Sequence, residues 1–313
     1  MSRLLARYPW FGPLVALVIV YALFASYAPE TFARGGNLVT MARQTVVVAI
    51  AAVGMTIVIV HGGIDLSVGS SVALGTVVIA KLLKLGYGPG TAALGGVATC
   101  AAAGLAVGVL VTRLKVTPFI VTLGAMSILR GVAKGIANEQ KIDVDPRGLD
   151  SLLSPSSGLG LPIGVWIAIA IAILAAAMLR YTRFGRHVFA VGSNEQTARL
   201  CGIDVAHVKL AVYALAGLLV GVAAVMEFST LTVGDPTTSS GLELDVIAAV
   251  VIGGASLSGG EGSIAGALVG ALLMTVIRTG CTHVDLPTWV QQIVTGVIIV
   301  VAVAVDRLRH ARR

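Results

Sequence analysis

The chain has 313 residues, of which 57% are hydrophobic and only 12% are charged. Soluble domains carry roughly twice that share of charged residues, about 25%, and a soluble fold of this length could not hide so much apolar surface. The net charge is +7 at pH 7, but the basic residues are scattered over loop ends without a long run, which disfavours a nucleic-acid site. The composition therefore indicates an integral membrane protein.

The apolar residues form blocks of about 17 to 23 residues, the length that a helix needs to cross the hydrocarbon layer of a bilayer. They lack the period-two alternation of barrel strands, and the 38 glycines favour close helix contacts. We therefore predict an all-α, polytopic protein with about ten transmembrane helices in a single transmembrane domain, residues 1–313. The predicted spans are 10–28, 45–60, 68–85, 90–112, 116–134, 162–179, 208–229, 244–256, 264–281 and 287–305.

The distribution of Lys and Arg sets the expected orientation, because cytoplasmic loops are enriched in them. With both termini in the cytoplasm, the inner segments hold 13 of the 22 basic residues but only 5 of the 15 acidic residues. The first apolar block is too long for a typical signal peptide and is expected to be a retained helix. A polar loop at about 138–162 then lies on the periplasmic side, and the longest cytoplasmic loop is 180–209.

Two similar segments interrupt apolar runs. The first reads Gly-Gly-Ile-Asp-Leu-Ser from Gly62, and the second reads Gly-Gly-Ala-Ser-Leu-Ser from Gly253. Duplicated, Gly-interrupted segments mark transport pathways in many membrane proteins, since broken helices expose backbone groups near the midplane; two ordinary tight loops are the alternative. The pathway candidates taken from these segments are Gly62, Gly63, Asp65, Ser67, Gly253, Gly254, Ser256 and Ser258.

Glu227 joins these candidates because an ionisable residue inside a span is unfavourable unless it is paired or hydrated. The competing interpretations are that Asp65 caps the next helix and that Glu227 reaches the outer interface. Asp235, Glu243 and Asp245 fall in an outer loop, where they could contact a partner or solute, or simply be solvated.

Within the cytoplasmic loop, Gly192 to Ile203 is typical of a short amphipathic helix. Asn194 can cap its N-terminus, Glu195 is favourable in its first turn, and Gly202 can end it. The three cysteines and five histidines show no metal-ligand or catalytic spacing, so neither a metal site nor an enzyme active site is indicated.

Three stretches together resemble the ribose-type family of ABC sugar permeases: Gly62 to Ser70; Gly192 to Ile203 with its continuation Val208 to Gly221; and Glu243 to Gly270. The resemblance covers nearly the whole chain. It implies a permease dimer, of two identical chains or with a sister permease, in the bacterial inner membrane. The implied partners are cytoplasmic ABC ATPase subunits and a periplasmic sugar-binding protein, and no nucleic acid is expected.

In that resemblance, the cytoplasmic segment couples the permease to the ATPase. The coupling residues are Gly192, Asn194, Glu195, Ala198, Arg199, Gly202 and Ile203. Leu257 to Glu261 imitates the signature sequence of ABC ATPases, but the chain has no phosphate-binding loop, so we expect no bound cofactor, with ATP-Mg used by the partner. The implied function is import of a ribose-like monosaccharide by alternating access. A branched-chain amino acid permease and an ion-coupled secondary transporter are the alternatives.

Overall fold

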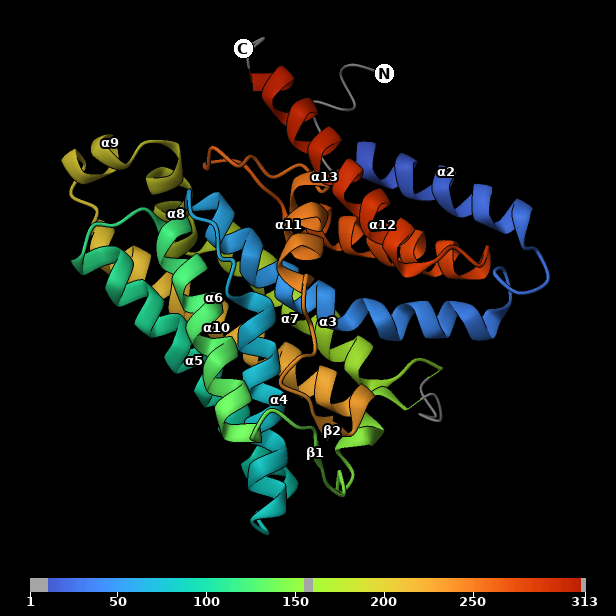
Figure 1. Ribbon diagram of the computed structural model, residues 1–313. Helices are drawn as coiled ribbons and strands as arrows, with labels where there is room; N and C mark the ends of the chain where they lie inside the picture. Colours follow the sequence, from blue (N-terminus) through green and yellow to red (C-terminus); the bar gives the residue numbers. More distant parts are fainter. Residues whose placement is uncertain (1–10, 155–159, 311–313) are drawn as a thin grey trace.

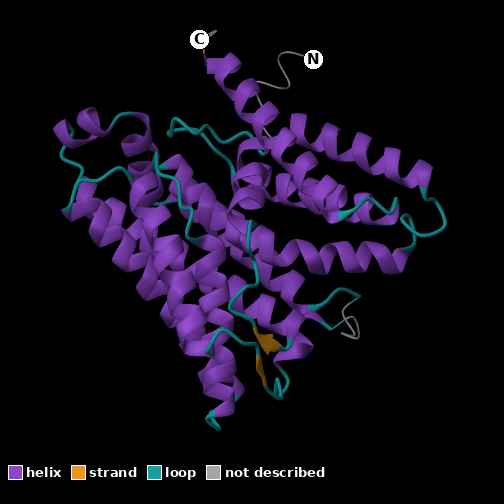
Figure 2. Ribbon diagram, in the orientation of Figure 1, coloured by secondary structure: helices purple, strands orange, loops and turns teal. Residues whose placement is uncertain are grey.

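The computed structural model describes residues 11–154 and 160–310, with side chains described as far as Ala304. The described chain is almost entirely helical (Figures 1 and 2). Its longer helices are α2 (Phe11–Tyr27), α3 (Gly35–Val60), α4 (Val68–Lys84), α5 (Pro89–Arg113), α6 (Pro118–Ala137), α7 (Ile163–Tyr181), α8 (Arg183–Ser193), α10 (Val205–Leu231), α11 (Leu242–Ile252), α12 (Ile264–His283) and α13 (Thr288–His310).

A helix occupies each predicted span, and within the described residues six helices are long and apolar enough to cross a membrane. The prediction of the α3 boundary was wrong, because this helix begins at Gly35 and the predicted span began at 45. The extra turns carry Asn37, Arg43 and Gln44, and polar residues of this kind ended the apolar block in the sequence. In the structure these three side chains line a cavity.

The centre of the molecule is built around α3 and α10. From Thr45 to Val60 every residue of α3 is buried, and α10 packs against α5, α3 and α4. The helix α11 is short, with 11 residues, which corresponds to about 16 Å of length and half of the hydrocarbon thickness. It packs against α12 and α3, so its end lies inside the protein.

The most extensive helix contact is between α5 and α10, and glycines make its close approach possible. A methyl group added to Gly217 would lie 2.6 Å from the carbonyl oxygen of Cys100, and one added to Gly104 would lie 2.8 Å from the Cα of Gly217. One turn further along, a methyl group on Gly221 would lie 2.7 Å from the Cα of Val97. Lipid-exposed helices cannot rely on the hydrophobic effect to associate, so close backbone packing has to hold this pair together.

Two ends of the molecule are distinguished by their loops. At one end α8 leads into the short α9 (Glu195–Leu200), and at the opposite end lies a two-stranded antiparallel ribbon (Figure 1). The ribbon joins β1 (Ile142–Asp143) to β2 (Val233–Gly234), with Ile142 opposite Gly234. It ties the 138–162 loop to the segment that follows α10.

Gly217→Val should destabilise the fold, because its Cβ would meet the α5 backbone at Cys100 and Gly104 and overpacking of this kind costs about 1–3 kcal/mol. The matched control is Gly131→Val on α6, where an added Cβ would meet nothing within 4 Å. Thermal unfolding in mild detergent measures the difference. Equal midpoint temperatures of unfolding for the two variants would show that the α5–α10 contact is not a principal source of stability.

Candidate functional site

The segment between α7 and α10 forms two capped helices. The Thr182 hydroxyl accepts a hydrogen bond from the Gly185 amide, 3.1 Å away, at the start of α8. The Asn194 side chain accepts one from the Thr197 amide, 2.9 Å away, at the start of α9. Gly202 then has a φ of +82°, and the Ile203 amide bonds back to the Ala198 carbonyl. The predicted N-cap at Asn194 and the predicted end at Gly202 are both confirmed. The helix between them, α9, has the bounds Glu195–Leu200 and is shorter than the predicted segment.

Glu195 attaches α9 to α10. Its carboxylate accepts a hydrogen bond from the Lys209 ammonium at 2.8 Å and one from Arg199 at 3.0 Å. The bond from Lys209 is the main reason that the pKa of Glu195 is lowered, with partial burial opposing the shift. A lowered carboxyl pKa means that this link stabilises the fold at neutral pH and is lost as the pH falls through the folded-state pKa.

The outer face of α9 is exposed. The Leu200 side chain is 89% accessible, and it borders a shallow depression together with Glu195, Gln196 and Arg199. Ala198, by contrast, is buried against the protein. The outer face of α9 therefore presents one large apolar side chain, Leu200, between the charged Glu195 and Arg199.

Near the end of α8, the backbone of Gly192 meets the backbones of two other segments, the end of α3 and the loop after α11. A Cβ on Gly192 would clash with the Val60 carbonyl oxygen and lie 2.7 Å from the Gly260 amide nitrogen. The Gly260 amide donates to that same Val60 carbonyl at 2.8 Å, and a Cβ on Gly259 would lie 3.0 Å from the Cα of Gly62. We call this contact the glycine junction. It joins the ends of α3 and α8 to the loop after α11 without intervening side chains.

The two repeated segments take related courses. After α3, the Gly62 amide bonds to the Ile59 carbonyl and the Gly63 amide to Val58; after α11, Gly254 bonds to Val251 and Ala255 to Val250. Gly62 and Gly254 both have positive φ, near +90°. Each helix therefore ends in the same glycine C-cap. The caps are offset by one residue relative to the sequence match, which pairs Gly62 with Gly253.

The polar residues of these segments form local turns. The Asp65 carboxylate accepts hydrogen bonds from the Ser67 amide at 2.8 Å and its hydroxyl at 2.6 Å. Ser256 accepts from the Ser258 amide at 3.2 Å. Asp65 thus shapes the turn before α4 and does not itself cap the helix, whose N-cap is Ser67. Gly253 lies against Gly266 of α12, where a Cβ would meet the Gly266 backbone.

A polar cavity of about 880 Å³ lies away from the glycine junction. Its walls come from the first half of α3, the last part of α10, the last half of α12 and the loops that follow α10 and α12. The polar lining consists of Asn37, Thr40, Arg43, Gln44, Glu227, Thr230, Ser239, Ser240, Asp245, Thr275, Arg278, Thr279, Thr282, His283, Asp285, Thr288 and Gln291. Its volume falls in the range typical of small-molecule sites.

Charged groups on the cavity wall are partly paired. Arg278 of α12 forms a salt bridge and hydrogen bond with Asp245 of α11. Thr279 donates to the Gln44 side chain at 3.1 Å. Glu227 accepts hydrogen bonds from Thr238 at 2.8 Å and Ser239 at 3.3 Å. Carboxylates, guanidinium groups and amides of this kind can hydrogen-bond a polyhydroxyl solute.

Of the predicted pathway residues, Glu227 alone lines this cavity. Among the others, Gly62 lies at the glycine junction, where it meets Gly192 and Gly259. Sequence reasoning missed Arg43, Gln44 and Arg278, which sit inside helices. They could have been found from their place in otherwise apolar helices, because polar and charged residues there face protein or water and avoid lipid.

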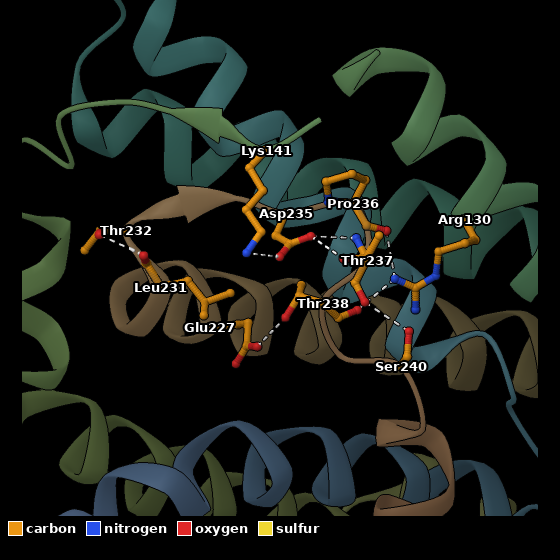
Figure 3. Close-up of polar contacts among 10 residues, drawn as sticks. All are labelled: Arg130, Lys141, Glu227, Leu231, Thr232, Asp235, Pro236, Thr237, Thr238 and Ser240. Carbon is orange, nitrogen blue, oxygen red and sulfur yellow. Dashed lines mark hydrogen bonds and ion pairs between the residues drawn. The ribbon is translucent and has the colours of Figure 1, made fainter. Parts of the chain in front are cut away.

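The loop that borders the cavity is held by polar contacts to two other elements (Figure 3). The Arg130 guanidinium donates to the carbonyls of Pro236, at 3.0 Å, and Thr238, at 2.7 Å. Asp235 accepts from the Thr237 amide and hydroxyl and pairs with Lys141 at 3.2 Å. Burial raises the pKa of Asp235, but the bonds from Thr237 and Lys141 more than offset this, so the net pKa is below its ordinary value.

Comparison with known proteins identifies the class. The family described as "Branched-chain amino acid transport system / permease component" matches residues 37–303. The ribose import permease protein of Escherichia coli is 40% identical over 300 residues, which cover 95% of this chain and 93% of that protein. The chain is a multi-pass membrane permease and belongs to this family.

Other relatives carry related names. The L-arabinose ABC transporter permease protein of Azospirillum brasilense is 35% identical over 96% of this chain and 88% of that protein. The D-allose transport system permease protein of Escherichia coli is 33% identical over 95% of this chain and 91% of its own length. No solved structure matches this chain.

Glu195→Gln should loosen α9, because an amide cannot form the ion pair with Lys209. We expect amide hydrogen exchange across Glu195–Leu200 to accelerate several-fold, with exchange in α12 unchanged. Arg199→Gln is the control, since the Arg199 side chain is 69% accessible and exposed pairs contribute little. If both variants exchange alike, the Lys209 contact does not anchor α9.

Proposed function

We propose that this chain is the membrane-spanning permease subunit of an ATP-binding-cassette importer that carries a monosaccharide across a bacterial inner membrane. The observation that carries the proposal is the 40% identity to a ribose import permease across nearly the full length of both chains. Relatives named for arabinose and allose extend the substrate class to pentoses and hexoses. The polar cavity supplies hydrogen-bonding groups suited to such solutes.

The orientation follows from where the basic residues and the α8–α9 segment lie. Arg183, Arg186 and Arg199 all fall at the α9 end of the molecule, and cytoplasmic loops are enriched in such residues. With about ten crossings, both termini are cytoplasmic, the α9 end faces the ATPase, and the polar cavity faces the periplasm. The sugar then enters the cavity from a periplasmic binding protein.

ATP hydrolysis takes place on partner subunits in this proposal, and this chain has neither a nucleotide site nor a bound cofactor. The exposed face of α9, centred on Leu200, is the surface that docks on the ATPase. Movement of α9 reaches α3 and α11 through the glycine junction, because the contact is backbone to backbone and cannot be taken up by side-chain rotation. Two permeases, identical or sister chains, form the complete pathway.

The two alternative functions are less well supported. A branched-chain amino acid permease shares the family description, but relatives at 40%, 35% and 33% identity are named for ribose, arabinose and allose. A secondary transporter would use ionisable groups within the spans. The buried carboxyl groups of Asp65 and Asp245 are two such groups and are the observation in its favour. The α8–α9 docking surface has no use in that mechanism, so it favours the ATP-driven importer.

Leu200→Asp should release the ATPase, because it places a charge at the centre of the docking surface. The measurement is the amount of ATPase that co-purifies with the tagged permease from native membranes in mild detergent. Arg186→Asp on α8, outside that surface, is the control and should retain the partner. Retention of normal ATPase by Leu200→Asp would contradict the docking role of α9.

Gly192→Ala should uncouple ATP hydrolysis from sugar import, since its Cβ would push α8 away from the Val60 carbonyl. We expect the import rate to fall at least about tenfold, with the assembled complex still hydrolysing ATP. Gly90→Ala is the control, because an added Cβ there meets nothing within 4 Å. Normal import by Gly192→Ala would remove the glycine junction from the mechanism.

A further inference from the structure

The loop between α11 and α12, residues 253–263, carries the imitation of the ABC ATPase signature, Leu257–Glu261. A glycine-rich loop holds phosphate with free backbone amides. Here the Ser258 amide donates to the Ser256 hydroxyl at 3.2 Å, and the Gly259 amide donates to the Ser256 carbonyl at 3.0 Å. The Gly260 amide donates to the last carbonyl of α3 at 2.8 Å. As folded, the loop offers none of these three amides to a phosphate, so nucleotide binding does not explain the segment.

This loop has a buried base and an exposed tip. The Ser256 amide donates to the Glu261 carbonyl at 3.0 Å and closes the turn. Ala255 and Ser256 are 2% and 1% accessible, whereas Ser258 and Glu261 are exposed. An exposed carboxylate is unfavourable in lipid. The residues Leu257–Glu261, which we name the loop tip, therefore face water or a soluble partner.

The loop tip lies directly against the junction of α8 and α9. A Cβ on Gly259 would lie 2.7 Å from the carbonyl oxygen of Gly192, and one on Gly260 would lie 2.9 Å from the Cα of Ser193. Ser193 ends α8 and Asn194 caps α9, and both are exposed. Figure 1 shows this loop, in orange, at the same end of the molecule as α9. The exposed atoms of the loop tip and of α9 therefore share one end of the molecule.

The α9 helix is too small to hold a protein partner by itself. Its six residues give a helix about 9 Å long. A stable protein interface takes about 800 Å² and roughly 20–30 residues from each side. Any protein that docks on α9 must therefore also contact neighbouring exposed segments. The loop tip is such a segment, and its backbone contacts to the end of α8 fix its position relative to α9.

We propose that the loop tip is a second docking point for the ATPase subunit, beside α9 in one continuous surface. The proposal rests on the importer function proposed above. The loop tip belongs to the segment that joins α11 to α12, and its Gly260 amide is bonded to the end of α3. An ATPase seated on the loop tip therefore contacts the α11–α12 connection directly, in addition to the contact that it makes through α9.

The test is site-specific photo-crosslinking in the assembled importer. The photoreactive amino acid p-benzoylphenylalanine replaces Ser258 in a tagged chain that is expressed with its ATPase and binding protein. Leu200 of α9 receives the same probe as the positive reference. Ser240 is the matched control, because it is an exposed serine in the loop after α10, which borders the polar cavity. Complexes purified in mild detergent are irradiated, and mass spectrometry identifies the attached chain by the peptide of its phosphate-binding loop.

We expect the probe at Ser258 to crosslink to the ATPase, as the probe at Leu200 does, and the probe at Ser240 to give no ATPase crosslink. If the ATPase co-purifies and the Ser258 probe attaches only to lipid or to a second permease, the proposal is overturned. A crosslink from Leu200 in the same preparation would then leave the importer function and the α9 contact intact. Equal ATPase crosslinking from Ser258 and Ser240 would also overturn the proposal, because the contact would not be confined to one end of the molecule.

Absence of any co-purifying ATPase from the unaltered chain would remove the proposed function, and this inference with it. Should the Ser258 variant fail to assemble, Glu261 takes the probe, because it is the other exposed end of the loop tip. The same outcomes apply: an ATPase crosslink that is absent from Ser240 supports the second docking point, and attachment to lipid or permease alone contradicts it.

Discussion

Direct contact between backbones, made possible by glycine, is the constraint on which this structure depends. Lipid offers no hydrophobic gain for bringing helices together, so the chain gains contact energy by removing side chains from the contact surface. Gly104, Gly217 and Gly221 do this between α5 and α10, and Gly192, Gly259 and Gly260 do it at the glycine junction. Between α5 and α10 the result is close helix packing. At the glycine junction it is a direct backbone contact among three segments.

In the proposed function, the glycine junction is the contact through which the short helix α9 influences the core. The α9 helix has only six residues, and one exposed leucine marks its outer face. It is capped at both ends and bonded to α10 through Glu195 and Lys209, and these contacts hold it against its neighbours. Because α3 and the loop after α11 meet α8 without side chains between them, displacement of α8 must move both.

Much of the fold could be predicted from the sequence. Long apolar blocks locate helices reliably in a membrane protein, since lipid leaves the backbone no other way to satisfy its hydrogen bonds. The caps of α9 were predictable because Asn194 and Gly202 have strong local preferences. The start of α3 was not, because polar residues that line a cavity inside the protein look the same in sequence as polar residues in a loop.

The candidate site was harder to predict for a related reason. The Gly-Gly segments were visible as a repeat, but their contact with Gly192 depends on packing between residues more than sixty positions apart in the chain. Arg43, Gln44 and Arg278 face one cavity only because α3 and α12 lie side by side. Likewise, an unpaired hydroxyl such as that of Ser70 or Tyr213 can be recognised only when its surroundings are known.

The most direct test of the central claim is sugar uptake by vesicles that contain the purified permease, its ATPase and its binding protein. We expect accumulation of labelled sugar to require ATP on the side of the membrane that carries the ATPase, and to persist when ionophores collapse the proton and sodium gradients. Uptake by the permease alone, driven by a proton or sodium gradient and indifferent to ATP, would contradict it.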